Sequence, residues 1–287
     1  MKVVAFRRLT ISCLLLFLTL ASSLIWAVDL TPAEIVAKHL AAVGTEQART
    51  QIKSRVVQGG STYRVLVGGT GAIDGKFVFA SEGQKSNFLF KINANGFMGE
   101  QFICDGNKTS VAGTHTDKTR SEFGNFVLSQ DTVLRENLLG GVWSSGWPLL
   151  NIDARKATLR SEGLKKADGH EYLVLRYQPK KITDMDISLY FDPQTYRHLM
   201  TIYKVTITGG IGEFGETSSA RKQETRYRIE ERFSEFKAVD GLTLPNHYDL
   251  RFTLELDNGF TKAIEWEVRA LGILNNQSVD PRSFEVK

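Results

Sequence analysis

The sequence ISLYFDPQTYRHLMTIYKVTI, residues 187–207, decides the fold. Every second residue from Ile187 to Phe191 is apolar, which is the pattern of a strand with one buried face. Asp192-Pro193 interrupts this pattern, because proline fixes φ for a turn and has no N–H to donate to a neighbouring strand. Extended structure resumes from His198 to Ile207. The stretch therefore predicts two strands joined by a short turn.

The same alternation recurs on both sides of this stretch. Apolar and charged residues alternate at 227–233, 250–256 and 264–268, and shorter extended runs occur at 63–67, 77–79, 88–92 and 101–104. Asx-Gly pairs favour tight hairpin turns because both residues tolerate positive φ. Six of them separate or flank these runs: Asp74-Gly75, Asn95-Gly96, Asp105-Gly106, Asp168-Gly169, Asp240-Gly241 and Asn258-Gly259. We therefore expect an up-and-down antiparallel sheet and a mainly β fold with a few helices.

Two helices are expected beside the strands. The first follows Thr31, which completes a Thr-x-x-Glu capping box with Glu34, and it ends before Gly44. The second runs over 123–139 and is followed by a tryptophan-rich apolar loop, 142–150. This second helix and its loop have two possible roles. They either pack into the core of the sheet or form a lid over a cavity.

The N-terminus has the features of an export signal. Lys2, Arg7 and Arg8 precede an apolar core at 14–20, and Ala27 ends a passable cleavage site. We expect residues 1–27 to be a signal peptide and 28–287 to be a single exported domain, located in the periplasm; an uncleaved membrane anchor is the alternative. Removal of the signal leaves 33 basic and 32 acidic residues, so the basic character lies mostly in the signal and no nucleic-acid partner is expected.

The rest of the chain carries no recognisable catalytic motif. His-Glu-x-x-His, Cys-x-x-Cys and Gly-x-Ser-x-Gly are all missing from the sequence, and the five histidines occur singly. After removal of the signal, Cys104 is the one remaining cysteine, so no intrachain disulfide can form. We therefore expect a protein that is not an enzyme and that has no metal site and no cofactor.

What the strands do offer is apolar surface. A long antiparallel sheet curls, and an incompletely closed barrel leaves a concave apolar face. We expect this face to consist of Phe77, Phe79, Phe88, Phe90, Ile187, Leu189, Phe191, Ile202, Phe252, Leu254 and Trp266. Either helices fill this face, which gives a core, or an apolar ligand does.

Four segments resemble the outer-membrane lipoprotein-sorting protein family, which is similar to the periplasmic lipoprotein carrier LolA. They are the helix 33–44, the turn Cys104-Asp105-Gly106-Asn107-Lys108, the segment Tyr190-Phe191-Asp192-Pro193-Gln194-Thr195, and 236–245, FKAVDGLTLP. The resemblance implies an incomplete antiparallel β-barrel with covering helices and a cavity that takes acyl chains in the periplasm. It also implies that Val133, Leu134, Leu138 and Trp143 belong to a lid.

Two functions follow as hypotheses. The first is a periplasmic carrier or binding protein for lipoprotein acyl chains or other lipids, with the eleven residues of the apolar face as its ligand-binding residues. The second is a non-catalytic envelope interaction or stress-sensor module whose concave face is filled by its own side chains. Membrane or envelope proteins are further expected partners. A void lined by Phe and Leu would favour the carrier, and a packed interior would favour the module.

Overall fold

The structure is a computed structural model, and it describes residues 30–94, 97–114, 120–209 and 223–286. The chain divides into a unit of residues 1–30 and a compact unit of residues 31–287. The predicted signal peptide, 1–27, lies outside the described residues. Within the described ranges, no helix combines the length and apolar character needed to cross a membrane.

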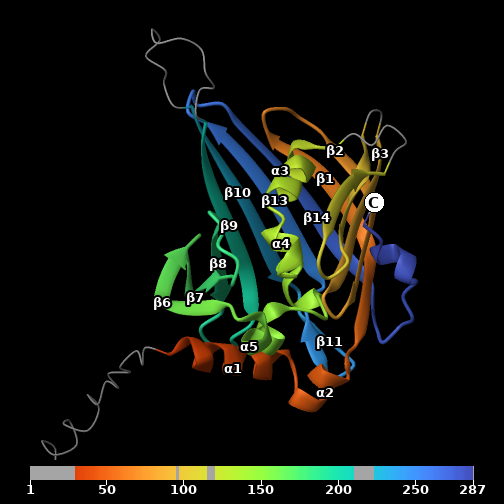
Figure 1. Cartoon of the computed structure of the whole chain (residues 1–287), viewed down its shortest axis with the longest axis vertical. Coiled ribbons are helices and arrows are strands. Elements are labelled where there is room, and N and C mark those ends of the chain that lie inside the picture. Colours follow the sequence, from red (N-terminus) through yellow and green to blue (C-terminus); the bar gives the residue numbers. More distant parts are fainter. Residues whose placement is uncertain (1–29, 95–96, 115–119, 210–222, 287) are drawn as a thin grey trace, which may run out of the picture. The chain divides into compact units, whose positions relative to one another are not determined.

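Twelve strands form one antiparallel sheet in the order β5-β4-β3-β2-β1-β14-β13-β10-β9-β8-β7-β6 (Figure 1). Over the part of the chain that the structure describes, β5 and β6 stand at the two ends of this order, so the sheet is not closed. The predicted fold class, mainly β with an incomplete antiparallel barrel, is confirmed. The strands are β1 (Ser54–Val67), β2 (Ala72–Glu82), β3 (Lys85–Ala94), β4 (Phe97–Cys104), β5 (Thr109–Gly113), β6 (Thr158–Ala167), β7 (His170–Gln178), β8 (Asp186–Phe191), β9 (His198–Gly209), β10 (Gln223–Ser234), β13 (His247–Leu256) and β14 (Thr261–Asn275), and β11 (Lys237–Val239) pairs with β12 (Leu242–Leu244) in a small hairpin.

Most of the expected Asx-Gly turns are present. Asp168-Gly169 and Asp240-Gly241 both have positive φ at each residue, as a two-residue hairpin turn requires. Asp105-Gly106 and Asn258-Gly259 lie between β4 and β5 and between β13 and β14. The expectation for Asp74-Gly75 is wrong, because this pair lies inside β2. The pair Asn95-Gly96 lies outside the described residues.

Two helices lie near the N-terminal end of the larger unit, α1 (Pro32–Val43) and α2 (Glu46–Gln51). The capping box of α1 is present: Glu34 N–H donates to the Thr31 hydroxyl, and the Glu34 carboxylate accepts from the Thr31 backbone N–H at 2.8 Å. The 3₁₀ turn η3 (Pro281–Phe284) packs against β3 near the C-terminus.

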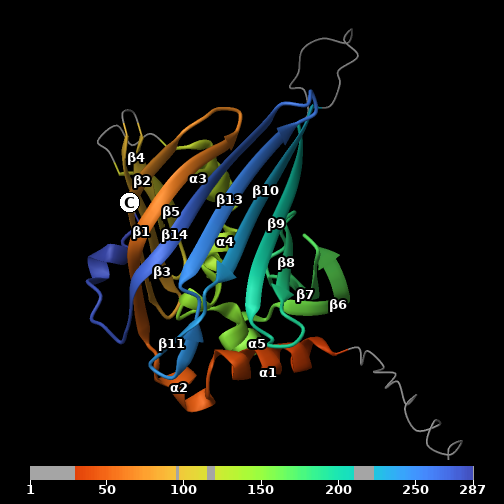
Figure 2. The same ribbon diagram turned by 180° about the vertical axis from the view of Figure 1, so that it is seen from behind.

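The concave face of the sheet is covered by residues 121–151. They form α3 (Glu122–Ser129), α4 (Thr132–Arg135) and the 3₁₀ turns η1 (Gly141–Trp143) and η2 (Pro148–Asn151), and α5 (Ile152–Arg155) follows. Figure 1 shows α3 and α4 in front of the sheet, and Figure 2 shows them behind β1, β14, β13 and β10. The prediction of a single helix over 123–139 is wrong, because the structure has two helices there. Gln130 leaves helical geometry, and the Asp131 side chain bonds Thr109 and Arg135.

Candidate functional site

Ten of the eleven predicted ligand-binding residues share the concave face. The strand register places Phe77 opposite Phe90 and Phe79 opposite Phe88, and it extends the same face to Ile187, Leu189, Phe191, Phe252, Leu254 and Trp266. Their rings contact one another, with centroids 4.1 Å apart for Phe79 and Phe88 and 5.5 Å apart for Phe90 and Trp266. The concave face is therefore a continuous, largely aromatic surface.

Ile202 lies on the opposite face of the sheet, which corrects the prediction. Its cross-strand partners are Ser188 and Glu230, whereas Thr201 lies opposite Leu189 and Glu231 on the concave face. The pairing of β8 with β9 shifts between Tyr190 and Phe191, and apolar residues occur on both faces of β9. Alternation alone could not assign the face of Ile202 for this reason.

The concave face is packed with side chains of the chain itself. Phe123 of α3 contacts Trp266, Phe252 and Phe102 at centroid distances of 4.9, 5.4 and 5.2 Å. Phe126 stacks on Tyr227 at 4.8 Å. All ten residues of the aromatic surface are consequently buried, and the interior is filled in this conformation.

The covering residues divide into two parts with different attachments, joined at Gly140. We call residues 121–139, which contain α3 and α4, the lid, and residues 141–151, which contain η1 and η2, the base. Val133, Leu134 and Leu138 lie in the lid and Trp143 lies in the base, and all four are buried. The sequence prediction had placed all four in one lid.

Buried hydrogen bonds hold the base to the sheet. The Arg55 guanidinium donates to the carbonyls of Val142 and Trp143 at 2.7 and 3.3 Å, and its Nε donates to Asn275. Trp143 Nε1 donates to the carbonyl of Pro245 at 2.8 Å. Burial lowers the pKa of Arg55 to about 10, so Arg55 remains charged at neutral pH and the base stays anchored by a charged donor.

The lid has weaker polar attachments. At its start, the Glu100 carboxylate accepts from the Ser121 backbone N–H and hydroxyl at 2.6 and 2.7 Å, and Lys262 pairs with the half-exposed Glu122. The buried side chains of α3 are apolar, apart from Gly124, which has none. Hydrogen bonds that water can replace contribute little net free energy, so the attachment of α3 depends mainly on its apolar packing.

A buried carboxylate marks the junction between lid and base. Glu231 Oε1 accepts the Gly140 backbone N–H at 2.6 Å and the Tyr248 hydroxyl at 2.7 Å, and Oε2 accepts the Tyr203 hydroxyl at 2.5 Å. Burial raises the pKa of Glu231 to about 7, although all three hydrogen bonds oppose the shift. Burial also raises the pKa values of Tyr203 and Tyr248, so both phenols stay protonated and donate.

Two buried histidines lie near the base. His39 of α1 accepts from Trp147 Nε1 at 3.4 Å through Nε2, which leaves Nδ1 to donate to the carbonyl of Tyr196 at 3.0 Å. His198 stacks on Trp147 and bonds the Thr201 hydroxyl at 2.8 Å. Burial lowers the pKa of His39 to about 4 and lowers that of His198 as well, so both rings are neutral and structural at neutral pH.

Exposed apolar residues gather near the end of the sheet where the β1–β2 and β13–β14 hairpins turn. Val67 of β1 pairs with Ala263 at the start of β14. Phe260 lies in the turn between β13 and β14 and is 48 % exposed. Ile207 lies at the same end of the sheet, in β9. It pairs with Thr225 of β10, and Thr225 in turn pairs with Leu256 of β13. Leu66 of β1 is also exposed. We call Leu66, Val67, Ile207 and Phe260 the apolar rim.

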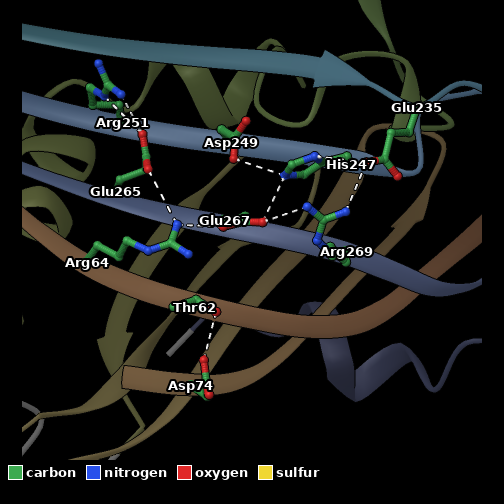
Figure 3. Close-up of polar contacts among 10 residues, drawn as sticks. All are labelled: Thr62, Arg64, Asp74, Glu235, His247, Asp249, Arg251, Glu265, Glu267 and Arg269. Carbon is green, nitrogen blue, oxygen red and sulfur yellow. Dashed lines mark hydrogen bonds and ion pairs between the residues drawn. The ribbon is translucent and has the colours of Figure 1, made fainter. Parts of the chain in front are cut away.

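The outer face of the sheet carries a charged hollow of about 190 Å³ (Figure 3). His247 faces Asp249 at 3.3 Å and Glu267 at 3.4 Å, and Glu267 also accepts from Arg64 at 2.6 Å. Arg251 pairs with Glu265 at 2.7 Å. Among the described residues, no three His, Cys, Asp or Glu side chains gather as metal ligands. Acidic and basic groups neutralise one another here, and the hollow does not favour a ligand of either charge.

Sequence reasoning missed the two residues that hold the covering segment. Glu231 follows Glu230 in a strand whose residues alternate, so one of two consecutive carboxylates must face inward. This doublet was a usable signal for a buried acid. Arg55 has no comparable signal, because its neighbours do not form a clear alternating pattern.

Comparison with known proteins finds similarity among solved structures. No family model and no curated protein matches this sequence. A LolA superfamily protein from Nitrosomonas europaea is similar in structure, with 12 % identity over 90 % of this chain and 98 % of its own, and a TM-score of 0.44. MucB from Pseudomonas aeruginosa, solved with MucA, has 11 % identity over 85 % of this chain and 99 % of its own, and a TM-score of 0.23. A structure of MucB alone has 12 % identity over 82 % of this chain and 92 % of its own, with a TM-score of 0.24. These similarities concern the fold alone.

Proposed function

We propose that this chain is a non-catalytic binding protein of the periplasm that takes up an acyl chain of a lipid or lipoprotein beneath α3. The observation that carries this proposal is the continuous aromatic face, which is covered at one end by a helix held mainly by apolar side chains. The apolar rim lies at the same end of the sheet. The expected signal at 1–27 supports the location.

An acyl chain must compete with the side chains that fill the interior now. Exposing Phe123, Phe126 and Val127 costs roughly 5–9 kcal/mol at about 1.5–3 kcal/mol for each buried apolar side chain. Burying a sixteen-carbon chain contributes about 12 kcal/mol at about 0.8 kcal/mol per methylene. A sixteen-carbon chain therefore exceeds the cost of displacing α3, whereas an eight-carbon chain, at about 6 kcal/mol, does no more than match it. The proposal predicts a steep dependence of affinity on chain length.

The test is fluorescence titration of the full chain with dansyl-labelled fatty acids of 8, 11 and 16 carbons. We expect saturable binding that strengthens with chain length. Phe126→Ala should strengthen binding, because it weakens the packing that the ligand must displace. The matched control is Leu271→Ala, which changes an exposed leucine of β14 and should leave binding unchanged. Absence of saturable binding in both the parent protein and Phe126→Ala would refute the proposal.

The packed interior favours a second candidate, a non-catalytic envelope interaction or sensor module. In this alternative the ten residues of the aromatic surface are a permanent core, and a protein partner binds elsewhere on the sheet. The two candidates differ in the response to Phe126→Ala. A permanent core loses about 3–5 kcal/mol when a buried Phe becomes Ala and gains no affinity for fatty acids.

A further inference from the structure

The junction between lid and base is a tight glycine pair pinned to the sheet. Gly140 and Gly141 have φ of +80° and +52°, which favours glycine at both positions. A Cβ at Gly140 would lie 2.5 Å from Phe88, and one at Gly141 would lie 2.8 Å from Phe233. The Gly140 N–H meets Glu231 inside this contact. Opening that carries Gly140 away from the sheet together with the lid therefore breaks this bond.

The bond to Glu231 differs from the other polar attachments of the lid. Asn137 to the Gln84 carbonyl, Thr109 to Asp131 and Tyr177 to Glu136 are part-buried, and water can replace them as the lid opens. Of the hydrogen bonds described between lid or junction and sheet, the one from Gly140 to Glu231 has both partners buried. Glu231 at the junction and Glu100, which accepts from Ser121 at the start of the lid, are thus the two buried carboxyls whose environments change on opening, and burial raises the pKa of both.

The groups that face Glu231 supply no compensating positive charge. Tyr203 comes from β9, Tyr248 from β13 and the Gly140 N–H from the covering segment, and all three are neutral donors. His198, on the far side of Gly141, is neutral. The buried guanidinium of Arg55 in β1 donates to carbonyls of the base and to Asn275. A charged Glu231 is therefore stabilised by hydrogen bonds alone.

We propose that Glu231 is a proton-linked latch: the lid stays closed over the interior while this carboxyl is protonated, and opening is favoured when the carboxyl is charged and gains access to water. A charged carboxylate is penalised in the buried site and not in water, so the closed lid binds the proton more tightly than the open lid. The closed-state pKa of about 7 places the transition near neutral pH. The latch rests on the proposed function in one respect, which is that opening uncovers an acyl-binding face.

The size of the effect follows from proton linkage. With a pKa of about 7 in the closed state and about 4.5 in the open state, the opening equilibrium rises roughly tenfold between pH 6 and pH 8. The sign is fixed, because the closed state holds more protons than the open state in this range. Raising the pH therefore favours the open lid.

Hydrogen exchange of the full chain without lipid tests the latch. After correction for the intrinsic pH dependence of exchange, peptides covering 121–140 should exchange about tenfold faster at pH 8 than at pH 6. Peptides of α1 and of the base should not show this acceleration. In Glu231→Gln, which cannot ionise, the acceleration in 121–140 should disappear.

Two results would overturn the latch. One is an unchanged pH profile in Glu231→Gln, and the other is equal acceleration in α1, which would indicate global unfolding and a merely structural carboxyl. Tyr248→Phe provides a second variant: it removes one donor to the charged form, so the transition should move to higher pH, and no movement would contradict the proposal. Because exchange is measured without ligand, a normal latch with no fatty-acid binding rejects the acyl proposal alone. Fatty-acid binding without pH-linked exchange rejects the latch alone.

Discussion

The Glu231 carboxylate lies 2.6 Å from the backbone nitrogen of Gly140, and this contact joins strand β10, which lies between β13 and β9, to the junction of lid and base. Arg55 holds the base on the other side of this junction through the carbonyls of Val142 and Trp143. The result is a covering segment with a fixed base and a lid whose removal depends mainly on apolar packing and on two buried carboxyls, Glu231 and Glu100.

Replacement of Glu231 should change how stability depends on pH. Its pKa is raised in the folded state, so the carboxyl lowers stability as pH rises from about 4.5 toward 7, by about 3 kcal/mol in total. The stability of Glu231→Gln should not decline in this way over the same pH range. Urea unfolding of both proteins at pH 5 and pH 8 measures the difference, and parallel pH profiles would contradict it.

His39 should change the pH dependence of stability in the opposite direction, because it lowers stability at acid pH. Its pKa is lowered to about 4 by burial, so the folded protein loses stability as pH falls from about 6.5 to 4, by roughly 3 kcal/mol. His39→Gln should lose less stability than the parent protein over this pH range. The exposed His170 provides the control, since His170→Gln should follow the parent profile. Thermal unfolding at pH 4.5 and pH 7 separates the two variants, and equal acid losses in both would count against a buried neutral His39.

Arg55→Met should destabilise the fold strongly. It leaves the buried carbonyls of Val142 and Trp143 without their charged donor, at about 1–3 kcal/mol for each unsatisfied group. Arg251→Met is the matched control, because Arg251 forms an exposed ion pair with Glu265 worth at most about 1 kcal/mol. The prediction fails if urea unfolding gives similar losses for the two variants.

Leu138→Glu should open the lid and leave the sheet folded. Leu138 is buried in the lid just before the junction, and a charge there favours the open lid over burial. We expect stronger lipid uptake, as for Phe126→Ala, because the ligand no longer has to displace a closed lid, and a modest fall in the thermal midpoint. A fall as large as that of Arg55→Met would indicate a permanent core. Leu128→Glu, on the exposed side of α3, controls for the added charge.

The strand pattern predicted the sheet well because period-2 alternation reports which face is buried. It failed where residues on both faces are apolar, as at Ile202, and where glycine serves close packing instead of a turn. At Gly75, a Cβ would lie 2.4 Å from the Lys91 carbonyl oxygen, so the glycine is required inside β2.

The aromatic surface could be predicted and its covering could not. Which side chains fill a concave face depends on tertiary packing between segments far apart in sequence, such as Phe123 against Trp266. The break between α3 and α4 likewise depends on the contact of Asp131 with Thr109 of β5. Local propensity does not contain either relationship.

Quenching of tryptophan fluorescence by a brominated sixteen-carbon fatty acid tests the acyl site most directly. Trp266 lies in the aromatic surface beneath α3, in contact with Phe123, whereas Trp147 lies in the base beside His39. We expect saturable quenching of the full chain that is largely lost in Trp266→Phe and retained in Trp147→Phe. Quenching that does not saturate, or that is unaffected by Trp266→Phe, would contradict acyl binding beneath α3.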